Sequence, residues 1–172
     1  MKKNKYMSMV YLSDYAHHPA EIRQSILSIK QLYEGRRIKA IFQPHLYTRT
    51  RDFYRDFADA LSLLDDVAIV DIYPAREQPI PGVTSRLIYD NLRPGIKKQL
   101  CTKDEICDIV RQGGFDVLVT LELIIDSRTI RELQEDNHRL RLLNEQISAE
   151  KNVEIIEIND NRAQPESYFT PF

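Results

Sequence analysis

Cysteine is almost absent from this chain, with only Cys101 and Cys107 among 172 residues. The two are not arranged as a CxxC pair, and no other cysteine could complete a metal-binding set. A disulfide framework and a cysteine-based metal site are therefore not expected, and we predict no metal centre. A chain of this kind belongs by default in a reducing cytoplasm.

Long apolar runs and a strong net charge are also missing. No run approaches the roughly 20 residues that a membrane-spanning helix requires. The basic residues 1–5 are not followed by the apolar region of a signal peptide. A net charge of −2 offers no broad basic surface for nucleic acid or for an anionic membrane. We predict a protein that binds neither.

Glycine is scarce as well, and this scarcity excludes a particular nucleotide site. The five glycines are scattered, and none belongs to a GxxxxGK[ST] phosphate loop. Such a loop needs its glycines close together, because its backbone N–H groups must surround the phosphates. This chain therefore has no phosphate loop of that type.

What the sequence does contain is a regular alternation of short apolar runs and longer amphipathic segments. Apolar runs occupy residues 7–12, 38–42, 67–72 and 115–121, with a weaker one at 97–101. Helical spacing or capping signals fall between them, over residues 19–33, 53–64, 85–92 and 102–112. Three or four unbroken apolar strands alternating with helices predict an α/β fold with a doubly wound, mostly parallel sheet.

The last 51 residues follow a different pattern. Residues 127–151 are highly charged with apolar positions at helical spacing, and residues 153–158 form a possible strand. We therefore divide the chain into residues 1–121 and an extension at residues 122–172, an extra helix and strand. This extension is expected either to pack on the same sheet or to pair with another chain as a homo-oligomer.

A polar and cationic turn follows the apolar run at residues 38–42. It contains His45, Tyr47, Arg49 and Arg51, and it leads into a helix with an apolar face. In open α/β sheets, ligands bind at turns of this kind, at the carboxyl edge of the sheet. Two arginines beside a helix N-terminus suit an anionic ligand, because guanidinium groups and first-turn N–H groups can converge on it. The alternative is a solvated basic turn.

Two further polar loops follow predicted strands. Asp14, His17 and His18 come after the first strand, where a carboxylate can hold a ribose hydroxyl and an imidazole can move a proton. The alternative is a helix entry in which His18 caps and His17 is solvated. Arg76 and Glu77 follow the third strand, where a salt-bridged turn is the simple alternative. All three loops are expected at one edge of one sheet.

The residues of these loops resemble the C-terminal domain of the Mur ligase family, which acts in peptidoglycan synthesis. The resemblance covers residues 10–121 and rests on residues 14–22 (DYAHHPAEI), 42–53 (FQPHLYTRTRDF), 71–77 (DIYPARE) and 79–85 (PIPGVTS). The related ligase that recycles murein peptides shares the first motif. The HLYTRT turn is more similar to the members that add L-alanine to UDP-N-acetylmuramate.

The resemblance implies a Rossmann-like fold and an ATP-dependent reaction. Family members use ATP and Mg²⁺ to phosphorylate the muramate carboxylate, and the amine of L-alanine then forms an amide. Six residues of this sequence match positions with implied roles: His45 and Arg49 as catalytic residues at the transferring phosphate or the alanine carboxylate, Asp14 at the nucleotide ribose, and His17, His18 and Arg76 along the substrate.

The resemblance also implies that this domain works with others. The N-terminal substrate-binding domain and the central ATPase domain of the family would precede Met1, so this chain alone is expected to be inactive and to bind no ATP tightly. After Leu121 the family usually continues with a glycine-containing turn, whereas this chain has Glu122. Beyond that point no resemblance exists. The alternative function is a non-catalytic binding or assembly protein that reuses this domain.

Overall fold

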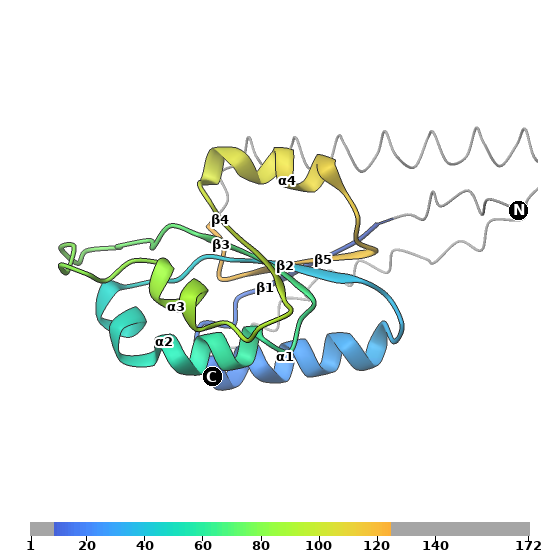
Figure 1. The fold of residues 1–172 in the computed structure, drawn as a ribbon, viewed down its shortest axis with the longest axis horizontal. Coiled ribbons are helices and arrows are strands. Elements are labelled where there is room, and N and C mark those ends of the chain that lie inside the picture. The colour runs from blue at the N-terminus through green and yellow to red at the C-terminus, as the bar shows by residue number, and fades with distance from the viewer. Residues whose placement is uncertain (1–8, 125–172) are drawn as a thin grey trace, which may run out of the picture.

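The computed structural model describes residues 9–124 as one parallel sheet with helices on both faces (Figure 1). Its strands lie in the order β1-β5-β2-β3-β4. Their bounds are β1 (Val10–Asp14), β2 (Ile38–Phe42), β3 (Asp66–Val70), β4 (Lys97–Cys101) and β5 (Val117–Leu121). The predicted doubly wound α/β fold is confirmed, with five strands in the described residues rather than three or four.

Within residues 9–124, three helices cover one face of the sheet, and one α-helix with a short 3₁₀ helix covers the other. Figure 1 shows α1 (Pro19–Leu32), α2 (Tyr47–Leu61) and α3 (Arg86–Asn91) on the lower side. The short 3₁₀ helix η1 (Lys103–Glu105) and α4 (Ile106–Gln112) lie above the sheet. The connections between β1, β2, β3 and β4 therefore cross one face of the sheet. The connection from β4 to β5 crosses the opposite face.

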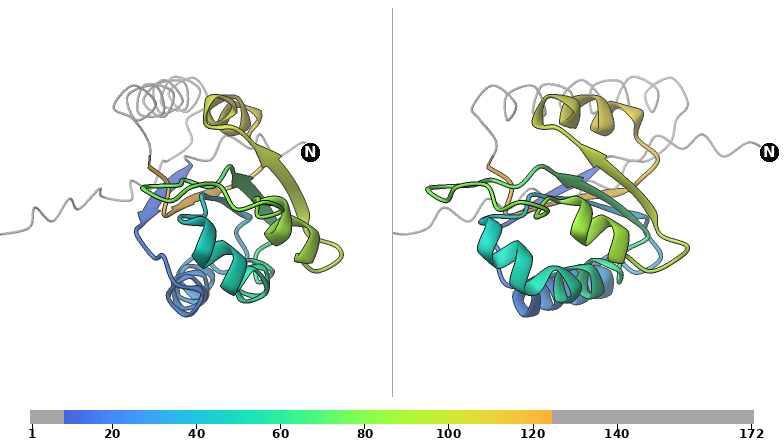
Figure 2. Two further views of the ribbon diagram at one scale, coloured as in Figure 1. Left: turned by 90° about the vertical axis from the view of Figure 1, so that its left-hand side faces the viewer. Right: turned by 60° about the vertical axis from the view of Figure 1, so that its left-hand side comes forward.

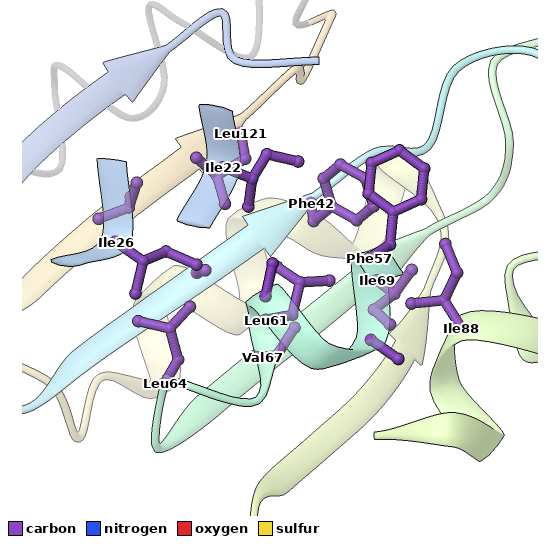
Figure 3. Close-up of a cluster of buried hydrophobic side chains, with 14 of the residues drawn as sticks. Ile22, Ile26, Phe42, Phe57, Leu61, Leu64, Val67, Ile69, Ile88 and Leu121 are labelled. Atoms are coloured by element: carbon purple, nitrogen blue, oxygen red, sulfur yellow. The ribbon is translucent and has the colours of Figure 1, made fainter. Parts of the chain in front are cut away.

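The core follows the two-residue period of the strands. In β2, Phe42 belongs to the hydrophobic cluster between the sheet and helices α1 and α2. Its neighbour Ile41 belongs to the smaller hydrophobic cluster between the sheet and α4. Figure 3 shows Phe42 and Phe57 in contact within the larger cluster, with their ring centroids 5.3 Å apart. Because β2 and β5 are buried on both faces, their sequences are apolar at every position except Lys39 and Thr120.

Local capping signals set several of the helix starts. Pro19 occupies the first position of α1, and His18 and Glu21 complete a capping box there. At η1, Thr102 and Glu105 form a capping box. Ser85 does not cap α3 with its side chain, because its hydroxyl donates to the Val70 carbonyl at 2.6 Å.

The first strand begins later than predicted. The apolar run at residues 7–12 suggested its position, but β1 spans Val10–Asp14. The pairing with β5 sets these bounds, since Val10 lies opposite Val117 and Asp14 opposite Leu121. Asp14 is therefore the last residue of the strand rather than part of the following loop.

Both cysteines are buried, Cys101 at the end of β4 and Cys107 in α4. Burial raises the pKa of the Cys101 thiol to about 11, so this side chain is a neutral core residue at ordinary pH. Within residues 9–124 no helix has the length and apolar character needed to cross a membrane. The predicted helix at 127–151 and strand at 153–158 lie outside the described residues, and the boundary at residue 121 stays a prediction.

Candidate functional site

The carboxyl ends of the parallel strands meet at one edge of the sheet, on the left in Figure 1. The left view of Figure 2 looks onto this edge. The loop after β2, the long loop after β3 and the residues after β5 come together here. Polar side chains from all three loops make contacts with one another. The sequence predicted that the loops after β1, β2 and β3 share this edge, and the parallel sheet places all three there, but the contacts of the cluster come from the loops after β2, β3 and β5.

The turn between β2 and α2 is fixed to the loop after β3. His45 and Tyr73 form an isolated parallel bridge, in which Leu46 N–H donates to the Tyr73 carbonyl at 2.9 Å. Tyr73 N–H donates in turn to the Pro44 carbonyl at 2.8 Å, and the rings of His45 and Tyr73 lie 5.0 Å apart. This bridge extends β2 and β3 beyond their last regular residues, and it holds the His45 backbone in place.

His45 and Arg49 converge on the carboxylate of Glu122. His45 Nδ1 lies 3.0 Å from Glu122 Oε1, and Arg49 Nη1 lies 3.1 Å from the same oxygen. His45 lies in the turn between β2 and α2, and Arg49 lies four residues further on, in the first turn of α2. Glu122 directly follows β5. The Glu122 side chain is only 3% exposed. We call His45 and Arg49 the cationic pair, with the charge on His45 depending on its protonation.

Two polar atoms in this cluster are buried without a hydrogen-bond partner in the described residues. They are His45 Nε2 and Glu122 Oε2. Buried polar atoms are normally paired, and an unpaired one costs about 1–3 kcal/mol. The cluster therefore keeps unused hydrogen-bonding capacity on both the imidazole and the carboxylate.

A second carboxylate occupies the N-terminus of α2. Glu77 accepts hydrogen bonds from the Thr48 backbone N–H at 3.0 Å and from the Thr48 hydroxyl at 2.5 Å. The sequence suggested that the first-turn N–H groups of α2 are free to bind an external anion. This is wrong for the Thr48 N–H, which donates to Glu77. Arg51 is also engaged, since its Nε lies 2.7 Å from Asp52 in a half-exposed pair. Of the two arginines, only Arg49 faces the cluster.

The Glu77 contact gives the first testable prediction. The Thr48 hydroxyl and then its backbone N–H stabilise the carboxylate, and they hold the pKa of Glu77 below its usual value. Because the folded pKa is depressed, the stabilisation is present above the unfolded pKa of about 4.3 and is lost as the pH falls through the folded value. The difference in unfolding free energy between wild type and Glu77→Gln should therefore shrink between pH 7 and pH 3.

Urea unfolding at both pH values measures this difference. Asp90→Asn, which changes an exposed carboxyl on α3, is the matched control and should show no comparable loss. An equal difference for Glu77→Gln at the two pH values would mean that the ionised Glu77 does not anchor α2.

Asp14, His17 and His18 form a separate group at the start of α1. The Asp14 carboxylate accepts hydrogen bonds from the Ala16 N–H at 3.0 Å and from the Ser25 hydroxyl. The His18 ring accepts from the Ala20 N–H, and it contacts the Phe53 ring edge-on at 5.3 Å. This geometry agrees with the alternative of a capped helix entry. Roles of the three in binding nucleotide or substrate stay predictions.

His17 and Arg76 lie at the surface. His17 is about half-exposed, and its Nδ1 lies 3.5 Å from Glu21 Oε2. Arg76 is exposed in the loop after β3, next to Glu77. The structure therefore brings His45 and Arg49 together and leaves His17 and Arg76 at the surface, where a role in substrate binding stays a prediction for each.

Strained backbone marks the same edge. Within residues 9–124, three residues other than glycine have a positive φ: Leu46 at 67°, Ala75 at 52° and Glu122 at 50°. They lie in the loops after β2, β3 and β5. Such conformations cost roughly 1–3 kcal/mol each and cluster where the surrounding structure serves a function. The strain supports a functional site at these three loops.

Glu122 and Glu77 are the residues that the sequence-based site missed. Glu122 was noted only for the absence of a glycine, although it is the polar residue that directly follows a buried parallel strand. The sequence analysis selected the polar residues that follow the other predicted strands, and the same criterion applied to the last strand would have selected Glu122. Glu77 was included in a predicted turn, but its partner Thr48 lies 29 positions away, and sequence alone does not indicate such a contact.

The fold and the site together define a doubly wound α/β domain with a cationic pair among the loops at its carboxyl edge. Over residues 2–120 the sequence matches the family described as Mur ligase, glutamate ligase domain. The chain therefore belongs to the Mur ligase family, as the resemblance of residues 10–121 had indicated.

Individual relatives agree with this assignment. The chain is 66% identical over 119 residues to the UDP-N-acetylmuramate–L-alanine ligase of Phocaeicola vulgatus, covering 69% of this chain and 26% of that protein. It is 60% identical over 111 residues to the enzyme of the same name from Parabacteroides distasonis, covering 64% and 24%. The chain thus spans about a quarter of the length of these relatives.

A solved structure shares the fold. The UDP-N-acetylmuramate-alanine ligase of Thermotoga maritima superposes with a TM-score of 0.56 at 23% sequence identity. The superposition covers 75% of this chain and 27% of that chain. At this identity the likeness concerns the fold alone, which is an α/β domain within a longer protein.

Proposed function

We propose that this chain is the C-terminal domain of an ATP-dependent ligase that joins L-alanine to UDP-N-acetylmuramate. The observation that carries the proposal is the convergence of His45 and Arg49 at the carboxyl edge of the sheet. The names of the relatives in the same family support this reaction. N-terminal and central ligase domains are its partners under this proposal, and a reaction that consumes ATP places it in the cytoplasm.

The residues present fit an anionic group better than they fit a metal ion. Arg49 supplies guanidinium donors, and His45 keeps an unpaired buried nitrogen at the same place. Within residues 9–124, no group of three or more histidine, cysteine, aspartate or glutamate side chains could hold a metal. We therefore assign phosphate or carboxylate binding to this chain, and Mg²⁺ binding to the partner domains.

ATP, when bound to the complete enzyme, supplies the phosphoryl group that activates the muramate carboxylate. Arg49 then binds and orients the anionic group, and it offsets the negative charge that grows at the transferring phosphate. His45 lies beside it, with its backbone held by the bridge to Tyr73. Asp14 is assigned to the nucleotide ribose, and His17, His18 and Arg76 to the substrate side.

The test is ATP-dependent phosphate release with UDP-N-acetylmuramate and L-alanine. It is run on this chain alone, on a separately made N-terminal plus central portion of such a ligase, and on the mixture. Activity only in the mixture would establish a working C-terminal domain. An absence of phosphate release in the mixture, with both parts shown to be folded by circular dichroism, would contradict the proposal. It would favour a non-catalytic binding protein.

A further inference from the structure

Glu122 makes the contacts with the cationic pair that an external anion would make. Its Oε1 accepts a hydrogen bond from Arg49 Nη1 at 3.1 Å and lies 3.0 Å from His45 Nδ1. Charge-assisted contacts at these distances are about twice as strong as neutral hydrogen bonds. Because the Glu122 carboxylate lies within contact distance of both His45 and Arg49, it occupies a place that a ligand oxygen would need in order to approach the pair.

We propose that Glu122 is an internal anion that holds the cationic pair in a self-neutralised state, so that a phosphate-bearing ligand binds only by displacing it. The inference rests on the proposed function in one respect, because it takes His45 and Arg49 as the phosphate-binding group. The new element is that Glu122 limits the access of ligands to His45 and Arg49. Only a ligand with more acceptor oxygens than a single carboxylate can then bind there.

The Glu122 carboxylate is held incompletely. Only Oε1 is bonded, while Oε2 is buried without a partner in residues 9–124. A buried carboxylate with half of its acceptor capacity unused offsets only part of its desolvation cost. A phosphate group presents three terminal oxygens, so it can bond Arg49 and reach His45 at the same time. It therefore competes with Glu122 more effectively than a monocarboxylate does.

The backbone around Glu122 is fixed, so displacement concerns the side chain. Glu122 N–H donates to the Asp14 carbonyl at 3.1 Å. Two residues further on, the Ile124 N–H donates to Gln43 Oε1 at 3.2 Å, and Gln43 Nε2 donates to the Asp71 carbonyl. These bonds keep the start of the segment after β5 between β1 and β2. The φ of 50° at Glu122 is a conformation that glycine adopts without strain.

The test measures the binding of inorganic pyrophosphate to the full 172-residue chain by isothermal titration calorimetry. Glu122→Gln removes the charge and keeps the shape, whereas Glu122→Gly removes the side chain and suits the positive φ. Both variants should bind pyrophosphate at least about tenfold more tightly than wild type, since the ligand no longer has to break the charge-assisted bond between Arg49 and Glu122. Asp90→Asn removes one negative charge on α3 and should change the affinity less than about twofold.

The double variant Arg49→Ala, Glu122→Gln tests whether pyrophosphate binds at Arg49. Adding Arg49→Ala should abolish the gain in affinity that Glu122→Gln produces. An equal affinity in wild type and both Glu122 variants would overturn the inference, as would an absence of binding in every variant. A gain as large in Asp90→Asn would assign the effect to net charge alone and overturn it too. Thermal melting of each variant establishes that it is folded.

The outcome is separable from that of the proposed function. Tighter pyrophosphate binding in the Glu122 variants with no ligation in the two-part assay would support the internal anion and contradict the ligase. Ligation in the two-part assay with unchanged pyrophosphate binding would support the ligase and contradict the internal anion.

Discussion

Replacement of Arg49 by alanine is expected to lower ligation in the two-part assay by at least about hundredfold, because removal of one preorganised group that stabilises transition-state charge commonly costs that much. Arg49 is the arginine of the β2–α2 turn whose guanidinium reaches the cluster, 3.1 Å from Glu122. The loss should appear mainly in kcat, because the charge on the transferring group grows in the transition state.

Arg51→Ala is the matched control for this prediction. Arg51 is the same residue type two positions further along α2, but it pairs with Asp52 and is half-exposed. Its removal should change ligation by less than about threefold, as expected for a surface ion pair. Arg49→Lys keeps the charge without the planar guanidinium and should recover only part of the activity. Equal rates for the two alanine variants would contradict the role given to Arg49.

The largest expected effect on stability is that of Asp66→Ala. Lys39 lies in β2 with its side chain 4% exposed, and its Nζ lies 3.0 Å from Asp66 Oδ1 on the neighbouring strand. Removal of the carboxylate leaves a buried ammonium without its counterion, which costs about 3–5 kcal/mol. Urea unfolding at pH 7 should show a corresponding loss of unfolding free energy.

Lys39→Met tests whether the cost arises from the unpaired charge. Replacement of the buried ammonium by an apolar side chain of similar length is expected to be close to neutral, and it should rescue most of the loss when combined with Asp66→Ala. Lys97 also contacts Asp66 but is 70% exposed, so Lys97→Ala should cost less than about 1 kcal/mol. A double variant as unstable as Asp66→Ala alone would show that the effect lies in lost packing.

Much of the fold follows from short-range patterns. Strands β2 and β5 are buried on both faces, so their apolar runs stand out in the sequence. The helices α1 and α2 have clear periods, and Pro19 and Gly35 bracket the first of them. The less accurate bounds belong to β1, because an edge strand carries alternating burial and its limits depend on its pairing with β5, more than 100 residues away.

The site was predictable only in part, for a related reason. His45 and Arg49 lie on one turn, so the sequence places them together. Glu122 and Glu77 reach this turn from the ends of other strands, and their contacts depend on strand order and backbone angles. The strand order β1-β5-β2 is what brings Glu122 beside His45. No residue pattern near position 122 encodes that neighbour.

The position of β5 also has a consequence for biosynthesis. It is the last strand of the described residues, yet it is inserted between the first two, with β1 paired on one side and β2 on the other. Before residues 117–121 have left the ribosome, β1 therefore lacks the partner that it has among the described residues, and one side of β2 is open. Non-local pairings of this kind close slowly and leave unpaired strand edges accessible meanwhile. The sheet is therefore completed only after β5 has been synthesised, and the contacts of Glu122 with His45 and Arg49 form only then.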